Sequence, residues 1–214
     1  MRLAPPLLMV GMALPFLAAA EPKHDVKPSI WKIGAAKDGS QSVSDGTLTV
    51  AFPAEAKVKA EGDYVSGDAE QKTGKKTKGY LSVERKPLPA EAKKAADPLK
   101  WLEASAKAEV EKEKAREPKN YRDVRLLKSE KIDFGKGGGW KSVVDSESEY
   151  ASLKIEGGMH NVTEQHVVLI GDYLYSLGAG GTGAPAVPQL FGDNTGFHKS
   201  EIAQQFLKSV RSVK

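Results

Sequence analysis

The sequence contains no cysteine among its 214 residues. This absence excludes disulfide bonds, a thiol nucleophile, a cysteine-based metal site and lipid attachment through cysteine. The Gly-x-Ser-x-Gly motif of a nucleophile elbow is also missing. After the first twenty residues, no apolar run is long enough to span a membrane. The sequence therefore predicts no recognised catalytic constellation, and no integral membrane protein once those twenty residues are removed.

The first twenty residues have the three parts of a secretory signal peptide. Arg2 supplies a positive charge, residues 3–17 are mainly apolar, and Ala18–Ala20 offer small side chains to a signal peptidase. A membrane anchor is the alternative, but this apolar run is short for a span and contains three prolines. We therefore expect residues 1–20 to be cleaved after Ala20 and the remaining chain to be periplasmic or secreted.

The protein also has only a small excess of positive over negative charge. The 32 basic and 28 acidic residues leave a net charge of only +4 at pH 7. Proteins that bind nucleic acid usually carry a stronger and more clustered positive charge. We therefore expect no nucleic-acid partner.

Polar and turn-forming residues prevail over residues 21–45, which predicts a flexible N-terminal segment. Its apolar stretch, Ile30–Ile33, is expected to add at most an edge strand. Residues 46–214 are long enough to bury a core without covalent cross-links. We expect them to form a single domain.

Alternating apolar residues predict strands in this domain. Leu48, Val50 and Phe52 alternate with smaller or polar residues, as in a strand with one buried face. Leu81 and Val83 do the same within a strand over residues 80–85. Further along, turn residues separate an expected antiparallel meander of five strands, at Val124–Phe134, Trp140–Ser146, Tyr150–Gly157, Met159–Ile170 and Tyr173–Leu177.

Two helices are expected. Asp97 can accept hydrogen bonds from free backbone N–H groups and Pro98 suits a first helical turn, so a helix is predicted from Pro98 to the Glu117-Pro118 break. A second helix is expected over Phe197–Val213, with Asn194 or Thr195 as its N-cap. Strands with helices at intervals, and no βαβ alternation, favour the α+β class.

Three loose motifs resemble the PsbP-like family, which includes an extrinsic subunit of photosystem II and bacterial envelope proteins. They are a strand ending in Phe52-Pro53, the segment His166–Leu177 with its Gly-Asp turn, and the C-terminal segment Phe206–Val213. The resemblance implies a central antiparallel β-sheet with helices packed on its two faces. It also implies a mostly non-catalytic protein that docks to partners.

Two segments are predicted to be surface loops that carry recognition. Residues 66–79 contain four lysines among glycines, and residues 178–196 are rich in glycine and proline. A mobile cationic loop could contact an envelope protein or an anionic surface, although a lysine-rich hairpin loop kept soluble by its charge is the more common explanation. The candidate partner-binding residues are Lys72, Lys75, Lys76, Lys78, Leu190 and Phe191.

Two other functions stay open. A small envelope hydrolase would need His160 or His166 to meet a serine or a carboxylate in a pocket. Asp145, Glu147 and Glu149 alternate along one strand and share a face, which suits either a divalent cation or simply the solvated face of a sheet. The sequence predicts no catalytic residue, cofactor or metal ligand with a recognised signature, so we expect a non-catalytic binding protein.

Overall fold

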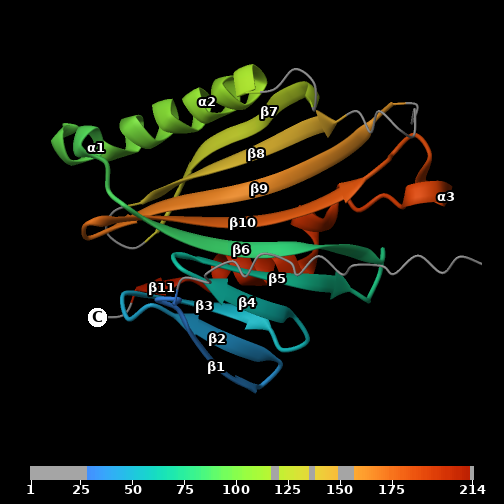
Figure 1. The fold of residues 1–214 in the computed structure, drawn as a ribbon, viewed down its shortest axis with the longest axis horizontal. Helices are drawn as coiled ribbons and strands as arrows, with labels where there is room; N and C mark the ends of the chain where they lie inside the picture. The colour runs from blue at the N-terminus through green and yellow to red at the C-terminus, as the bar shows by residue number, and fades with distance from the viewer. Residues whose placement is uncertain (1–27, 117–120, 135–137, 149–156, 213–214) are drawn as a thin grey trace, which may run out of the picture.

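The computed structural model describes residues 28–116, 121–134, 138–148 and 157–212. These residues form two antiparallel β-sheets and a small number of helices (Figure 1). The expected signal peptide at residues 1–20 lies outside the described residues, as does nearly all of the strand expected at Tyr150–Gly157. Within the described part, no helix is both long and apolar enough to cross a bilayer.

The smaller sheet has four strands in the order β1-β2-β3-β11. Their bounds are Lys32–Lys37 for β1, Ser40–Ser44 for β2, Leu48–Pro53 for β3 and Arg211–Ser212 for β11. The alternation predicted for β3 is confirmed, because Leu48, Val50 and Phe52 are fully buried. Since β11 pairs with β3, the C-terminal strand closes a sheet that the N-terminal strands begin.

The larger sheet has seven strands in the order β4-β5-β6-β10-β9-β8-β7. Four of the five strands predicted for the meander correspond to β7, β8, β9 and β10, which pair antiparallel in that order. Because β8 pairs directly with β9, the prediction of a further strand between these two in the sheet is wrong. The strands are β4 (Lys57–Glu61), β5 (Tyr64–Gln71), β6 (Thr77–Pro87), β7 (Tyr121–Ile132), β8 (Gly139–Ser148), β9 (Met159–Ile170) and β10 (Tyr173–Gly183).

The helices are α1 (Ala90–Lys94), α2 (Pro98–Arg116), α3 (Pro188–Phe191) and α4 (Glu201–Lys208), with a 3₁₀ turn, η1 (Phe197–Lys199), before α4. The predicted start of α2 is confirmed, because the Asp97 carboxylate accepts hydrogen bonds from two backbone N–H groups of its first turn. The last helix is shorter than expected. Its N-cap is Ser200, which accepts from the Ala203 N–H group, and neither Asn194 nor Thr195 serves as the cap.

Helices α2 and α4 cover opposite faces of the larger sheet, as the PsbP-like resemblance implied. Figure 1 shows α2 alongside β7 and β8, whereas α4 packs against β3, β5 and β10. Alternate residues of each strand therefore face different helices. Leu177, Val83 and Val168 point toward α4 and belong to the buried core, which also takes in the smaller sheet.

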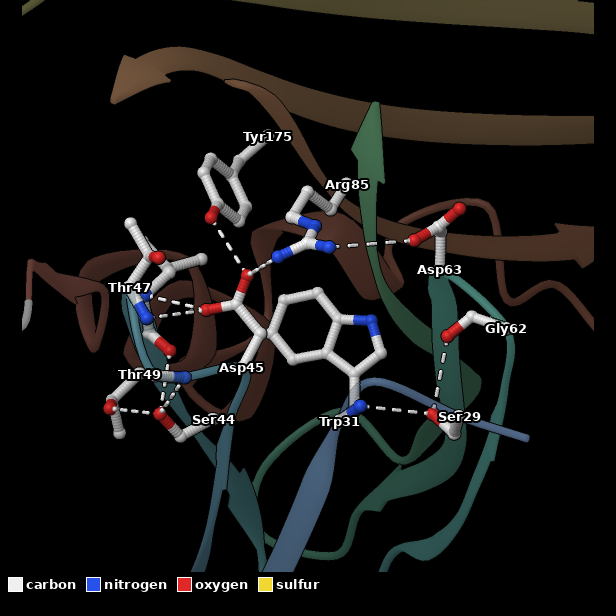
Figure 2. A network of polar contacts seen from close by, with 12 residues as sticks. Ser29, Trp31, Ser44, Asp45, Thr47, Thr49, Gly62, Asp63, Arg85 and Tyr175 are labelled. Carbon is white, nitrogen blue, oxygen red and sulfur yellow. Dashed lines mark hydrogen bonds and ion pairs between the residues drawn. The ribbon is translucent and has the colours of Figure 1, made fainter. Parts of the chain in front are cut away.

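One buried polar network joins the two sheets (Figure 2). Asp45 follows β2, and its side chain is fully buried. Its carboxylate accepts hydrogen bonds from the Tyr175 hydroxyl at 2.8 Å, from Arg85 at 3.1 Å and from the N–H groups of Thr47 and Leu48. Burial alone would raise the pKa of Asp45, but these donors outweigh it and hold the pKa below its ordinary value. Burial and the hydrogen bond to the Asp45 carboxylate raise the pKa of Tyr175 to about 12.

The flexible segment predicted over residues 21–45 is corrected for its described second half. Residues 32–44 form the β1–β2 hairpin, with Trp31 and Val43 in the core. Polar residues prevail because β1 is exposed along its whole length. A strand of this kind has no apolar alternation by which the sequence could reveal it.

The two predicted surface loops also need correction, because part of each is strand. In residues 66–79 only Lys72–Lys76 form a turn between β5 and β6. In residues 178–196, β10 continues to Gly183. Packing requires glycine at position 79 of the first segment, because a Cβ atom on Gly79 would lie 2.2 Å from the ring of the fully buried Phe197.

Candidate functional site

The four lysines predicted to bind a partner lie together on the β5–β6 hairpin, and all four are exposed. Lys72, Lys75 and Lys76 belong to the turn, and Lys78 is the second residue of β6. Leu190 and Phe191 are the last two residues of α3. The segment that follows α3 approaches the lysine hairpin directly.

Two contacts join these segments across more than a hundred residues of sequence. The Lys75 ammonium group lies 3.3 Å from the Asp193 carboxylate, and the Lys78 N–H group donates to the Asn194 side-chain oxygen at 2.8 Å. Asp193 also accepts from the Thr195 hydroxyl, which holds the pKa of Asp193 below its ordinary value. The two regions that the sequence predicted separately are thus one surface. We call it the basic edge: Lys72, Lys75, Lys76, Lys78, Asp193 and Asn194.

The charges of the basic edge are only partly balanced. Lys78 lies 3.9 Å from Glu70, and Lys75 is paired with Asp193. Among the described residues, Lys72 and Lys76 have no carboxylate within ion-pair distance. Lys72 and Lys78 line an open cavity of about 620 Å³ whose wall carries both signs of charge. Within the described part of the chain, the edge therefore presents two unpaired ammonium groups on the β5–β6 hairpin.

A second polar cluster surrounds Glu164 of β9 on the α4 face of the larger sheet. The Glu164 carboxylate is buried and lies 2.8 Å from the His166 ring, 3.1 Å from the Lys141 ammonium group and 3.3 Å from the Gln204 amide. Burial would raise the pKa of Glu164, but hydrogen bonds from His166 and Lys141 outweigh it and lower the pKa to about 2. The cluster borders a cavity of about 590 Å³.

A third cluster is built on Asp145 of β8. Its buried carboxylate accepts a hydrogen bond from Arg125 at 2.7 Å and lies 2.9 Å from Nδ1 of His160. The other ring nitrogen of His160 lies 3.0 Å from the Gly157 carbonyl oxygen. His160 is therefore held at both ring nitrogens. His198 is only 5% exposed, and this burial lowers its pKa.

The hydrolase hypothesis finds part of its geometry here. His166 does meet a carboxylate at the edge of a cavity. In the described residues, however, neither His160 nor His166 is hydrogen-bonded to a serine hydroxyl. An activated serine requires that contact, so the nucleophile of the proposed chemistry is missing from these two clusters.

The carboxylates of the cation hypothesis are not arranged as a metal site in the described residues. Asp145 and Glu147 lie on the same strand with the same parity, as predicted, but Asp145 already bonds Arg125 and His160. Glu149 lies outside the described residues. Within the part of the chain that is described, no three histidine, aspartate or glutamate side chains gather closely enough to hold a metal ion.

Neither protein-family models nor curated proteins match the sequence, but solved structures match the fold. The Ran-binding protein Mog1p of Saccharomyces cerevisiae aligns with a TM-score of 0.52 and 9% identity, covering 82% of this chain and 96% of that one. A point mutant of Mog1 aligns with a TM-score of 0.52 and 10% identity, over 82% and 96%. Cyanobacterial PsbP (CyanoP) of Synechocystis aligns with a TM-score of 0.46 and 12% identity, over 84% and 96%.

Likeness at these identities concerns the fold alone. The chain has an antiparallel α+β fold of the kind found in Mog1. The fold class predicted from the sequence is therefore confirmed, whereas membership of the PsbP-like family stays a prediction.

Proposed function

We propose that this chain is a non-catalytic binding protein of the cell envelope that docks to a partner protein through the basic edge. The observation that carries the proposal is the joining of the two predicted recognition segments by the Lys75–Asp193 and Lys78–Asn194 contacts. A surface held by such contacts keeps its shape before binding, which lowers the entropy cost of association.

Three further observations support this proposal. The Mog1 structures with a similar fold include one described as a Ran-binding protein, so a fold of this kind serves protein recognition. Lys72 and Lys76 offer ammonium groups for acidic side chains of a partner. The proposed location follows from the signal peptide predicted over residues 1–20.

A charge-reversal experiment tests the docking surface. The chain from Glu21 onward is tagged and cross-linked in envelope extracts, and recovered proteins are quantified by mass spectrometry. Lys72→Glu with Lys76→Glu is expected to reduce recovery of the partner at least about tenfold, because rim charges steer association and like charges repel. The matched control is Lys32→Glu with Lys37→Glu on the exposed strand β1.

Equal recovery by the wild type and both double variants would remove the basic edge from the proposed function. If the true target is an anionic surface, the chain will bind equally well to vesicles with and without envelope protein.

The proposed location is tested separately, by determining the N-terminal sequence of the native protein. A chain that begins at Glu21 in the envelope supports export, and an intact Met1 in the cytosol contradicts it.

A further inference from the structure

The face of the larger sheet that points toward α2 contains a further concave surface. A cleft of about 380 Å³ lies between this helix and strands β6, β8, β9 and β10. Its volume falls in the range of roughly 300–1,000 Å³ that is usual for small-molecule sites. We call it the α2 cleft, and its sheet-side wall includes Ser142, Ser146, Asn161, Thr163, Gln165 and Ser176.

This wall is polar where a sheet covered by a helix is ordinarily apolar. Helix α2 packs chiefly on β7 and β8 and buries Leu102 and Val110. The small side chain of Ala106 and the absence of a Cβ atom at Gly178 leave room between the helix and the sheet. The space is not closed by packing, so hydroxyl and amide groups line an open cavity.

One hydrogen-bonding group of the cleft is buried and has no partner among the described residues. It is the side-chain oxygen of Asn161. The neighbouring Ser142 and Ser146 also line the cleft, and each is less than a tenth exposed. A buried polar group without a partner is costly and uncommon in folded proteins. A hydrogen-bond donor that entered the cleft would supply the partner that the Asn161 oxygen lacks.

The charge of the lining restricts what that can be. The charged residues at the rim are already neutralised: Glu84 lies 2.8 Å from Lys86, and Glu109 lies 3.6 Å from Lys112. Phosphates and carboxylates need unpaired cationic groups or clustered N–H donors, which this lining does not offer. Apolar ligands need an apolar wall. The lining fits an uncharged ligand that carries many hydroxyl groups.

Two tyrosines complete the surface. Tyr64 and Tyr80 lie on neighbouring strands and both line the cleft, and Tyr64 is 44% exposed. An aromatic ring offers a flat face to the C–H groups of a sugar ring, while hydroxyl and amide side chains bind its edge. Tyr80 is already oriented by its hydrogen bond to Thr163.

We infer that the α2 cleft binds an uncharged oligosaccharide. The Asn161 oxygen accepts from a sugar hydroxyl or an acetamido N–H group, the serine hydroxyls donate or accept, and Tyr64 stacks on a ring. This inference does not depend on docking through the basic edge, because the cleft and the edge lysines are separate. It does not depend on catalysis either.

Titration calorimetry on the chain from Glu21 onward tests it with three probes: maltotriose, cellotriose and N,N′-diacetylchitobiose. One of them is expected to bind with a Kd below about 1 mM. Asn161→Ala is expected to weaken this binding about tenfold, the loss typical of a buried hydrogen bond to a ligand. The matched control is Gln205→Ala, which removes an exposed amide from α4, and it is expected to leave affinity unchanged.

A second measurement needs no variant that could misfold. In ¹⁵N-labelled wild-type protein, the probe is expected to shift the side-chain NH₂ signals of Asn161 and Gln165 but not that of Gln205. Three results would each overturn the inference: no binding of any probe at about 10 mM, equal weakening by Asn161→Ala and Gln205→Ala, or shifts confined to residues outside the cleft. The Lys72→Glu/Lys76→Glu variant keeps its sugar affinity, which separates this site from the proposed docking surface.

Discussion

The two faces of the larger sheet are made by the same strands and have opposite chemistry. On the face toward α4, Leu177 and Tyr175 of β10 are fully buried in a continuous core. On the face toward α2, Ser176 lies between them in sequence and lines an open polar cleft. Strand geometry alone separates neighbours in this way, because successive side chains point to opposite faces.

The two faces also differ in the charge of their polar groups. Asp45 and Glu164, on the core side, are buried carboxylates held by several protein groups. The wall toward α2 carries mainly uncharged hydroxyl and amide groups along an open cleft. Each side has one buried polar atom without a partner among the described residues, the Trp31 ring nitrogen in the core and the Asn161 oxygen toward α2. The core face therefore buries paired charges, whereas the α2 face presents neutral polar groups.

The largest expected effect is the loss of Asp45. Asp45→Ala leaves the largely buried Arg85 without its closest carboxylate, so we expect a loss of about 3–5 kcal/mol in the free energy of unfolding. Urea denaturation measures it. Glu84→Ala, on the neighbouring position of β6 but on the α2 face, is the control and should cost less than about 1 kcal/mol. Similar losses for the two variants would contradict the contrast between the faces.

Adjacent residues of β10 give a second comparison. Leu177→Ala removes a fully buried side chain and is expected to cost about 2–5 kcal/mol. Ser176→Ala removes only a hydrogen bond to Gln165, with an expected cost of about 1 kcal/mol. Equal midpoints of urea unfolding for the two variants would show that the assigned strand register is wrong.

Acid stability tests the Glu164 cluster. The folded-state pKa of Glu164 is about 2, well below its ordinary value, so its contribution is present above the unfolded-state pKa and is lost as pH falls toward 2. The contribution is at most about 3 kcal/mol. Glu164→Gln is expected to be less stable at pH 7 and to lose less stability between pH 5 and pH 2. A pH profile parallel to that of the wild type would exclude this role, and Glu201→Gln serves as the exposed control.

The smallest effect is expected at the basic edge. Lys75→Ala breaks an exposed ion pair with Asp193, and such pairs contribute about 1 kcal/mol or less. Thermal unfolding at low and high salt measures the change. Asp193→Ala should cost more, because it also removes the Thr195 hydrogen bonds. A larger loss for Lys75→Ala would mean that the ion pair is a main support of the fold.

Features that depend on residues close in sequence could be predicted, whereas features that depend on distant residues could not. The start of α2 was predictable because Asp97 acts on backbone groups two and three residues away. Asp45 was predictable only as a turn residue, since its partners Arg85 and Tyr175 are 40 and 130 positions distant. The lysine-rich and glycine-rich segments predict loops because they carry no apolar alternation. Part of each is strand in the structure, and Gly79 is needed there because a Cβ atom would collide with the Phe197 ring.

The candidate site shows the same limit. The four lysines could be identified from their spacing, but their junction with Asp193 and Asn194 depends on how β6 and β10 pair. The α2 cleft had no sequence signal at all. Serines and amides spread over four strands become one surface only when the strands lie side by side.

Alternation and capping act between near neighbours, so the α+β class, strands β7 to β10 and the start of α2 could be predicted from the sequence. Which buried polar groups have partners, as Glu164 does, and which lack one, as the Asn161 oxygen does, depended on the tertiary structure. The physical reason is that burial and hydrogen bonding at these positions depend on residues far away in sequence, which the folded chain alone brings into contact.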